Sequence, residues 1–162
     1  LSPSWGMYAG YELYEHLPFA EGKEEYRDSE KYEIKVRDWQ GAEKKGLSLA
    51  PFVKQLNEIR RENVALQRLR NLVFHNTNSD QVIAYSKRDG NNLVLVIVNL
   101  DGFHARECTV SWDMWALGID KDSFEVLDLL DGQKYSWQKE SYIKLDPARP
   151  HGKVAHICRV KL

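Results

Sequence analysis

This 162-residue sequence has few cysteines, almost no net charge and no long hydrophobic run. Two cysteines, Cys108 and Cys158, are too few for a disulfide framework or a cysteine-rich zinc site, so a reducing, cytoplasmic location is expected. The 23 Lys and Arg nearly balance 24 Asp and Glu, and the formal net charge of -1 argues against a sequence-independent nucleic-acid binder. The longest aliphatic run, Leu93–Val98, is too short to cross a membrane.

Aromatic residues, in contrast, are abundant. The chain has 5 Trp, 8 Tyr and 5 Phe, and hydrophobic residues make up 43% of it, which is enough for a packed core. Many of the aromatics lie in residues 1–47, where no sustained helical or strand period is present. Disordered segments are poor in aromatics, so we expect an ordered loop that packs against something. The sequence also begins at Leu1 rather than at a methionine, which favours a piece of a longer protein.

An amphipathic helix is predicted over residues 48–62, because apolar residues recur there at steps of three and four. These residues are Leu49, Phe52, Val53, Leu56 and Ile59. Ser48 is the expected N-cap and Asn63 the expected left-handed C-cap, with another short turn over residues 65–69.

From residue 72 onward the pattern is that of short β-strands separated by turn residues. The strands are predicted at 72–76, 81–87, 93–99, 107–112, 124–128, 133–137, 142–145 and 154–160. Asp89-Gly90 and Asp131-Gly132 are the expected hairpin turns. Eight such strands favour an antiparallel sandwich. Because Leu93–Val98 does not alternate with polar residues, we expect it to be buried on both faces, against the core and against either the helix or a missing domain.

The sequence gives little support for a metal site or a cysteine nucleophile. No two of the five histidines lie three or four residues apart, and Cys158 is the only thiol near His151 and His156, so no metal site is predicted. Cys108 and Cys158 fall within predicted strands and are expected to be buried, apolar side chains. A glycine-rich phosphate loop is absent from the sequence.

Lys31 and Tyr32 stand side by side in the aromatic-rich segment. A lysine can hold an anionic group, and a tyrosine can pack on a sugar face and donate a hydrogen bond. Burial statistics alone favour the simpler interpretation, an exposed lysine beside a packing tyrosine. Carboxylates are frequent between Glu12 and Asp38, but the sequence does not bring two of them together as a retaining glycosidase requires, and charged runs usually form solvated surface.

Several stretches carry a family resemblance. They are Leu1–Leu13, Asp28-Ser-Glu-Lys-Tyr-Glu33, Arg37-Asp38-Trp39, Leu56–Arg61, Ala65–Gln67, Leu69–Leu72 with Phe74 and His75, Val82–Asp89, Leu93–Leu100, Asp113-Met114 with Ala116–Gly118, and Ala155–Ile157. Together they resemble the maltose-1-phosphate-dependent α-1,4-glucan maltosyltransferases of bacteria, in glycoside hydrolase family 13. Residues 1–13 resemble the last barrel strand and its loop, and 82–100 the first long hairpin of the C-terminal β domain. The resemblance covers nearly the whole chain, and residues 28–39 are its most specific part.

The resemblance implies a mainly β chain, with an antiparallel C-terminal β-sandwich over residues 71–162. Residues 1–70 would be the tail of a (β/α)8 catalytic barrel: its last strand, a donor-binding loop and its last helix. It also implies that Lys31 and Tyr32 contact the maltosyl phosphate donor, which reverses the simpler interpretation of that pair. The carboxylates between Glu12 and Asp38 match none of the family's catalytic motifs, so no catalytic residue is assigned in this chain.

The mechanism implied by the resemblance is that of a retaining glycosidase with a sugar as acceptor. A carboxylate displaces phosphate from α-maltose 1-phosphate, and the 4-hydroxyl of an α-1,4-glucan end then attacks the maltosyl-enzyme. Those acids belong to earlier barrel strands, so this chain is expected to be inactive without its missing catalytic barrel. No cofactor or metal is expected. The resemblance allows for a homodimer of the full-length enzyme.

Two other function classes fit the sequence. Eight strands with surface aromatics would suit a non-catalytic carbohydrate-binding module, which titration with maltooligosaccharides would reveal. Alternatively, residues 11–47 would dock a partner chain, an interpretation that rests only on the charged segment.

Overall fold

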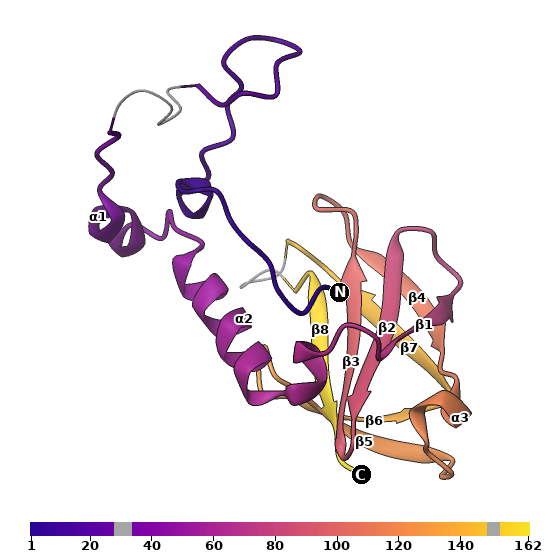
Figure 1. The fold of residues 1–162 in the computed structure, drawn as a ribbon. Helices are drawn as coiled ribbons and strands as arrows, with labels where there is room; N and C mark the ends of the chain where they lie inside the picture. Colours follow the sequence, from indigo (N-terminus) through magenta and orange to yellow (C-terminus); the bar gives the residue numbers. More distant parts are fainter. Residues whose placement is uncertain (28–33, 149–152) are drawn as a thin grey trace. The chain divides into compact units, whose positions relative to one another are not determined.

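The computed structural model describes residues 1–27, 34–148 and 153–162, and they fall into two compact units. The first unit is Ser4–Glu58, and the second joins Leu1–Pro3 to Ile59–Leu162. Figure 1 shows the helices of the first unit and the strands of the second. Among the described residues, no helix is both long enough and apolar enough to span a bilayer.

The Ser4–Glu58 unit is largely irregular. Its regular elements are the 3-10 helix η1 (Tyr11–Leu13), the helix α1 (Trp39–Lys44) and most of the helix α2 (Ala50–Glu62). A side-chain cap starts α1, because the Asp38 carboxylate accepts a hydrogen bond from the Gly41 N–H at 2.8 Å. The aromatic-rich segment is therefore structured over much of its described length, but by turns and caps rather than by long elements.

The predicted amphipathic helix is present as α2, although its two ends differ from expectation. The Ser48 hydroxyl accepts from the Ala50 N–H at 3.1 Å, and the helix begins two residues after Ser48. The predicted left-handed cap at Asn63 is wrong, since its φ of -118° and ψ of 99° are extended. Instead, the side-chain amide of Asn63 donates to the Ile59 carbonyl at 2.8 Å, which satisfies one carbonyl of the last turn.

All eight predicted strands are present in the second unit. They are β1 (Leu72–Thr77), β2 (Val82–Asp89), β3 (Asn92–Asn99), β4 (Arg106–Ser111), β5 (Ser123–Asp128), β6 (Lys134–Gln138), β7 (Glu140–Leu145) and β8 (Ala155–Val160). They form an antiparallel sheet in the order β6-β5-β8-β3-β2-β1-β4-β7, which curls around its core (Figure 1). The antiparallel β architecture expected from the sequence is confirmed.

The two predicted Asp-Gly turns connect strands at the positions expected from the sequence. Gly90 connects β2 to β3 with a φ of 58°, and Gly132 lies between β5 and β6 with a φ of 75°, a region that costs glycine little. A short helix, α3 (Met114–Leu117), follows β4 and was not predicted; the Asp113 carboxylate accepts from the Ala116 N–H at 2.9 Å to start it.

Strand β3 is buried on both faces, as its unbroken apolar run predicts. Leu93, Leu95 and Ile97 enter the main core, while Val94 and Val96 join a second cluster on the opposite face. The cover on that opposite face comes from the 3-10 helix η2 (Val64–Gln67), which contributes Ala65 and Leu66. This helix follows α2 directly, so residues next to the predicted helix supply the contact.

Candidate functional site

Lys31 and Tyr32, the predicted donor-binding pair, lie outside the described residues. The prediction for them therefore stays a prediction. The segments before and after this pair, residues 1–27 and 34–48, are described.

An ion pair joins Glu15 to Arg37, one residue from each of these two described segments. The Arg37 Nε lies 3.0 Å from Glu15 Oε1, and its Nη2 lies 3.1 Å from Oε2, so the guanidinium and carboxylate meet in a two-pronged contact. The Lys35 ammonium adds a second cation 3.2 Å from Glu15 Oε2. Hydrogen bonding to Arg37 and then to Lys35 outweighs desolvation and lowers the pKa of Glu15.

Residues 17–27 fold back on themselves. The Phe19 N–H donates to the Glu25 carbonyl at 2.7 Å, and the Arg27 N–H donates to the Leu17 carbonyl at 2.8 Å. The Tyr26 ring meets the Tyr8 ring edge-on, with centroids 5.8 Å apart. Residues 17–27 therefore pack against the aromatic segment at the start of the chain.

Three of the carboxylates between residues 12 and 38 have local structural partners. Glu12 accepts from the Gly10 N–H at 3.1 Å, Glu15 pairs with Arg37, and Asp38 caps α1. These contacts give each carboxylate a role that needs no substrate.

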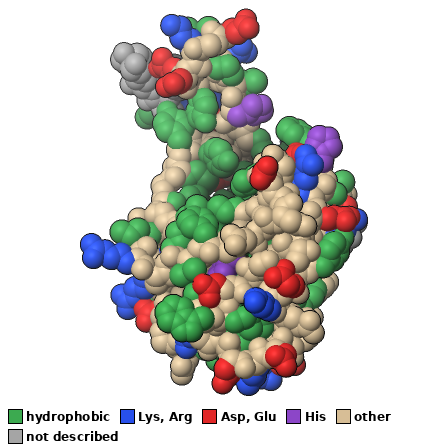
Figure 2. Space-filling model, turned by 90° about the vertical axis from the view of Figure 1, so that its right-hand side faces the viewer, with side chains coloured by type: hydrophobic (Ala, Val, Ile, Leu, Met, Phe, Trp, Pro, Cys, Tyr) green, Lys and Arg blue, Asp and Glu red, His purple; other side chains and the backbone are tan. Residues whose placement is uncertain are grey.

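Large hydrophobic side chains are exposed on the Ser4–Glu58 unit. Those at least half exposed are Tyr8, Tyr11, Tyr14, Leu17, Phe19, Ile34, Val36 and Leu47. Figure 2 shows hydrophobic side chains at the molecular surface, interspersed with charged ones. Exposed hydrophobic side chains that gather in a patch usually mark an interface or a ligand groove.

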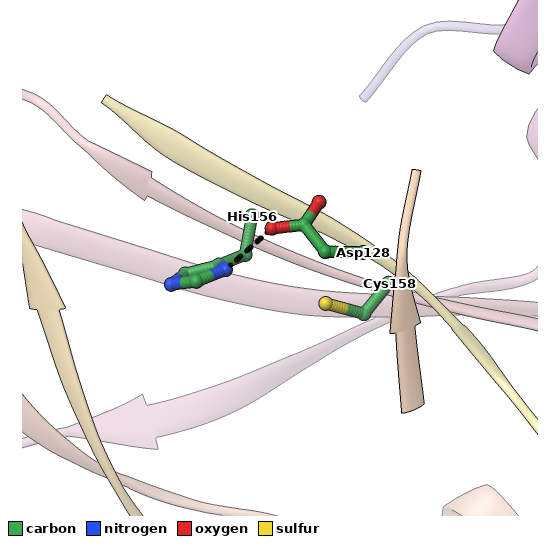
Figure 3. Close-up of side chains that lie close together, drawn as sticks. All are labelled: Asp128, His156 and Cys158. Atoms are coloured by element: carbon green, nitrogen blue, oxygen red, sulfur yellow. Dashed lines mark hydrogen bonds and ion pairs between the residues drawn. The ribbon is translucent and has the colours of Figure 1, made fainter. Parts of the chain in front are cut away.

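A second group of titratable side chains is buried in the β domain. Asp128 at the end of β5 faces His156 and Cys158 on β8, because Asp128 and Cys158 are paired in the sheet register. Their ligand-type atoms all lie within 4.8 Å of one another, and all three residues are buried (Figure 3). The His156 Nδ1 lies 2.8 Å from Asp128 Oδ2.

The arrangement of this group fits an internal ion pair better than a metal centre. The Lys153 ammonium lies 3.2 Å from Asp128 Oδ2 and 2.6 Å from Asp131 Oδ2, so a cation already neutralises the carboxylates. Burial raises the pKa of the Cys158 thiol, which keeps it protonated and a poor metal ligand. The chemistry of the donor set therefore gives no support to a metal here.

The pKa values of this group follow from burial opposed by hydrogen bonds. Burial by itself raises the pKa of Asp128, but hydrogen bonds from His156, the Leu130 backbone and Lys153 outweigh it and leave the pKa lowered. Burial likewise lowers the pKa of Lys153, and hydrogen bonds to Asp131, Tyr135 and Asp128 outweigh it and raise the pKa. Each partner thus keeps the other charged.

His75 is a third buried titratable group, on the core side of β1. Its Nδ1 accepts from the Asp113 N–H at 3.1 Å, so its Nε2 carries the hydrogen and donates to the Ser86 hydroxyl at 2.8 Å. Burial lowers the pKa of His75 despite the nearby Asp113 carboxylate. The ring is therefore held neutral as part of the core.

A family model for "GLGE, C-terminal" matches residues 74–160, which is more than half of the chain. The chain belongs to the GLGE C-terminal family. This confirms the resemblance that the sequence stretches indicated. The match covers all of β2–β8, and it includes the buried Asp128–His156 pair.

Similarity to curated relatives covers more of the chain than the family model does. The alpha-1,4-glucan:maltose-1-phosphate maltosyltransferase 1 of Streptomyces coelicolor is 54% identical over 161 residues, covering 99% of this chain and 23% of the relative. The maltosyltransferase of Mycobacterium tuberculosis is 49% identical over 160 residues, covering 97% of the chain and 22% of the relative. The chain thus spans roughly a quarter of the length of the curated relatives it matches.

Solved structures share the fold at low sequence identity. A maltogenic α-amylase, AmyB from Thermotoga neapolitana, aligns with a TM-score of 0.50 and 17% identity over 67% of the chain and 24% of its own. A variant of AmyP in complex with maltotriose aligns with a TM-score of 0.51 and 17% identity over 82% of the chain and 29% of its own. At this identity the likeness concerns the fold alone.

Sequence reasoning missed both ion-pair groups. Glu15 and Arg37 are far apart in the sequence, as are Asp128 and Lys153, and neither spacing matches a known motif. The signal that was available for the second group is the placement of Asp128 and Cys158 within predicted strands, which the structure shows to be neighbours in the sheet.

Proposed function

We propose that this chain is the C-terminal part of a retaining glycosyltransferase that moves maltosyl units from α-maltose 1-phosphate to the non-reducing end of α-1,4-glucans. The observation that carries the proposal is the 54% identity to a maltose-1-phosphate maltosyltransferase over 99% of the chain. Relatives from other genera with the same name support it, at 49% and 50% identity.

The proposal divides the chain by role. Residues 1–70 form the tail of the catalytic barrel, and residues 71–162 form the β domain. Lys31 and Tyr32 bind the donor: the ammonium of Lys31 makes charge-assisted hydrogen bonds to an anionic donor, and the Tyr32 ring packs on a sugar face. The carboxylates that break and form the glycosidic bonds lie in barrel strands outside this sequence.

The missing part of the barrel is the proposed partner of the exposed apolar side chains in the Ser4–Glu58 unit. Phe19 is 66% exposed, and Ile34 and Val36 are 92% and 93% exposed. Burying side chains of this kind contributes about 1.5–3 kcal/mol each, so contact with the barrel would stabilise this unit substantially. The β domain would support the barrel by covering apolar surface in turn. Its two buried, unpaired cysteines suit a cytoplasmic enzyme.

Phosphate release is the test of this proposal. The full-length protein, incubated with α-maltose 1-phosphate and glycogen, should release inorganic phosphate in proportion to glucan extension. The 162-residue chain alone should release none, because it lacks the catalytic acids. Release by the isolated chain, or none by the full-length protein, would overturn the proposal.

A second candidate, a carbohydrate-binding module, is favoured by one observation in the β domain. Trp115 on α3 is 92% exposed and Tyr142 on β7 is 64% exposed, and exposed aromatic rings are typical of sugar-binding faces. Titration of the isolated chain with maltooligosaccharides distinguishes the two functions. Saturable binding that is lost in Trp115→Ala or Tyr142→Ala would support the module.

A further inference from the structure

The β3–β4 turn, residues 100–105, presents two large apolar side chains to solvent. Phe103 is 89% exposed and Leu100 is 60% exposed, and only two residues separate them in the sequence. Single exposed apolar residues are ordinary on a soluble protein. These two differ because the turn that carries them is braced by buried and charged side chains.

Two polar side chains hold the β3–β4 turn in one shape. The Asp101 carboxylate accepts from the Phe103 N–H at 2.9 Å and from the His104 N–H at 3.2 Å. Arg106 Nε donates to the same carboxylate at 3.1 Å. Asn99 is only 6% exposed; it accepts from the Asp101 N–H at 2.9 Å and donates to the His104 carbonyl at 2.9 Å. Hydrogen bonds from the Phe103 N–H and from Arg106 lower the pKa of Asp101, so the brace keeps its charge at neutral pH.

A side chain on a braced turn loses little conformational freedom when a partner covers it. Ordering a loose turn opposes binding, and a turn that is already fixed avoids most of that cost. Aromatic residues that fill a pocket on a partner are typical centres of protein interfaces. Leu100 offers no polar group to a sugar hydroxyl, so the pair of side chains suits an apolar protein surface.

The contacts of residue 1 indicate which partner reaches this part of the β domain. The Leu1 amino group donates to the Tyr85 hydroxyl at 3.2 Å, and the Lys87 ammonium donates to the Leu1 carbonyl at 3.3 Å. Because Tyr85 precedes Lys87 on β2, residue 1 runs along β2 from its beginning toward its end. In the proposed full-length enzyme, the chain before residue 1 therefore arrives from the end of the sheet where β2 begins.

The β3–β4 turn stands at that same end of the sheet (Figure 1). Val82, the first residue of β2, pairs with Asn99, the last residue of β3. The Leu100 N–H then donates to the Gln81 carbonyl at 2.8 Å. The chain spans only 23% of one curated relative, so a much larger body of protein adjoins the β domain in the proposed enzyme.

We infer that Phe103 and Leu100 anchor the β domain to the part of the full-length enzyme that lies outside this sequence. The two side chains enter an apolar recess on that part, and the β3–β4 turn keeps its shape as they do so. The inference rests on the proposed function, because it takes the longer enzyme from it.

Thiol labelling of the full-length enzyme tests whether residue 103 is covered. Phe103→Cys is treated with a maleimide in the folded and in the urea-unfolded enzyme, and the tryptic peptide of residues 89–106 is quantified. That peptide holds neither Cys108 nor Cys158, which are both buried. We expect labelling to be several times slower in the folded enzyme. Equal rates in the two states would overturn the inference.

Asp122→Cys is the matched control, because Asp122 is exposed and precedes β5 at the opposite end of the sheet. There, Val126 of β5 pairs with Val160, the last residue of β8. Its thiol should react nearly as fast in the folded enzyme as in urea. The tryptic peptide of residues 122–134 also holds no native cysteine.

Thermal unfolding of Phe103→Ser gives a second readout. The midpoint of the full-length enzyme should fall by a few degrees, because the variant removes an interface anchor. The midpoint of the 162-residue chain should not change, since the Phe103 side chain is 89% exposed there. An equal fall in both would show that Phe103 acts within the β domain, and it would overturn the inference.

Two other results would assign the same surface to another occupant and overturn the inference. In the 162-residue chain, maltoheptaose that slows labelling of Phe103→Cys would make the turn a glucan platform. In the full-length enzyme, protection that is lost on dilution would place a second copy of the chain on it.

Phosphate release from α-maltose 1-phosphate separates this inference from the proposed function. A full-length enzyme that is active, but in which residue 103 labels freely, keeps the proposed function and loses the anchor. A full-length protein that is inactive, but in which residue 103 is protected, overturns the proposed function and leaves the contact standing.

Discussion

His156 Nδ1 lies 2.8 Å from Asp128 Oδ2 in the interior of the β domain, where both side chains are almost completely buried. The two residues come from β8 and β5, which are neighbours in the sheet. Lys153 adds a cation at 3.2 Å from the same oxygen, so three charged or polar groups share one desolvated site. A site of this kind is costly to break, because removing one partner leaves the others buried without compensation.

Asp128→Asn should therefore destabilise the β domain by about 3 kcal/mol, since it removes the charge that Lys153 and His156 face. Urea unfolding of the isolated chain, followed by tryptophan fluorescence, measures the change. Glu125→Gln is the matched control: Glu125 pairs with Lys161 at the surface, at 67% and 80% exposure, and such pairs contribute little. Equal effects from the two variants would contradict the account of the buried site.

The neutral state of His75 predicts a pH dependence of stability. Its pKa in the fold lies below the ordinary value of 6.5, so the unfolded chain takes up a proton before the folded chain does. The stabilisation is therefore complete above pH 6.5 and is lost as the pH falls from there through the lowered pKa. His75→Gln, which can still accept and donate, should flatten the stability curve in this range.

Urea midpoints between pH 7.5 and 5 provide the measurement for His75. The variant His16→Gln serves as the control, because His16 is exposed and should leave the curve unchanged. A wild-type stability that rises on acidification, or a His75→Gln curve parallel to the wild type, would refute the assignment.

Two tryptophans only three positions apart in the sequence should differ strongly in how much the same substitution destabilises the chain. Trp112 is 1% exposed, its ring stacks on Trp137 at 5.6 Å, and its indole N–H donates to the Ser141 hydroxyl at 3.2 Å. Trp112→Ala should cost about 3–5 kcal/mol, and Trp112→Phe less. Trp115 is 92% exposed, so Trp115→Ala should change stability by no more than about 0.5 kcal/mol. Thermal unfolding midpoints of Trp112→Ala and Trp115→Ala provide the measurement. Similar midpoints would contradict the placement of Trp112 in the core and of Trp115 at the surface.

Elements with a strong local pattern were predictable from the sequence. The apolar run of β3, the two Asp-Gly turns and the three- and four-residue spacing in α2 each carry a signal within one element. The short helices α1 and α3 were not predicted, because their 6 and 4 residues are too few to show a period. Their signal was the capping aspartates, Asp38 and Asp113. Asn63 was misassigned because an asparagine after a helix can cap through its side chain without entering the left-handed region.

The candidate sites were harder to predict, for a physical reason. Glu15 meets Arg37, and Asp128 meets Lys153 and His156, only because the fold brings together residues that are distant in the sequence. Spacing cannot reveal such pairs unless the strand register is known. Lys31 and Tyr32 were identified through resemblance to a family, since an isolated Lys-Tyr pair has no specific physical signature.

Lys31→Ala in the full-length enzyme should lower kcat/KM for α-maltose 1-phosphate by about 10- to 150-fold. This corresponds to the loss of a hydrogen bond to a charged group, worth about 1.5–3 kcal/mol. Initial rates of phosphate release at varied donor concentration provide the measurement. Lys45→Ala, an exposed lysine after α1, is the control and should leave the constant unchanged. An unaltered constant in Lys31→Ala would remove Lys31 from the donor site.

Mass analysis of the glucan products tests the central proposal most directly. The full-length enzyme, given α-maltose 1-phosphate and a maltooligosaccharide acceptor, should yield a ladder of products that differ by two glucose units. The isolated chain should leave the acceptor unchanged. Products that differ by single glucose units, or free maltose as the main product, would contradict the assignment of this chain to a maltosyltransferase.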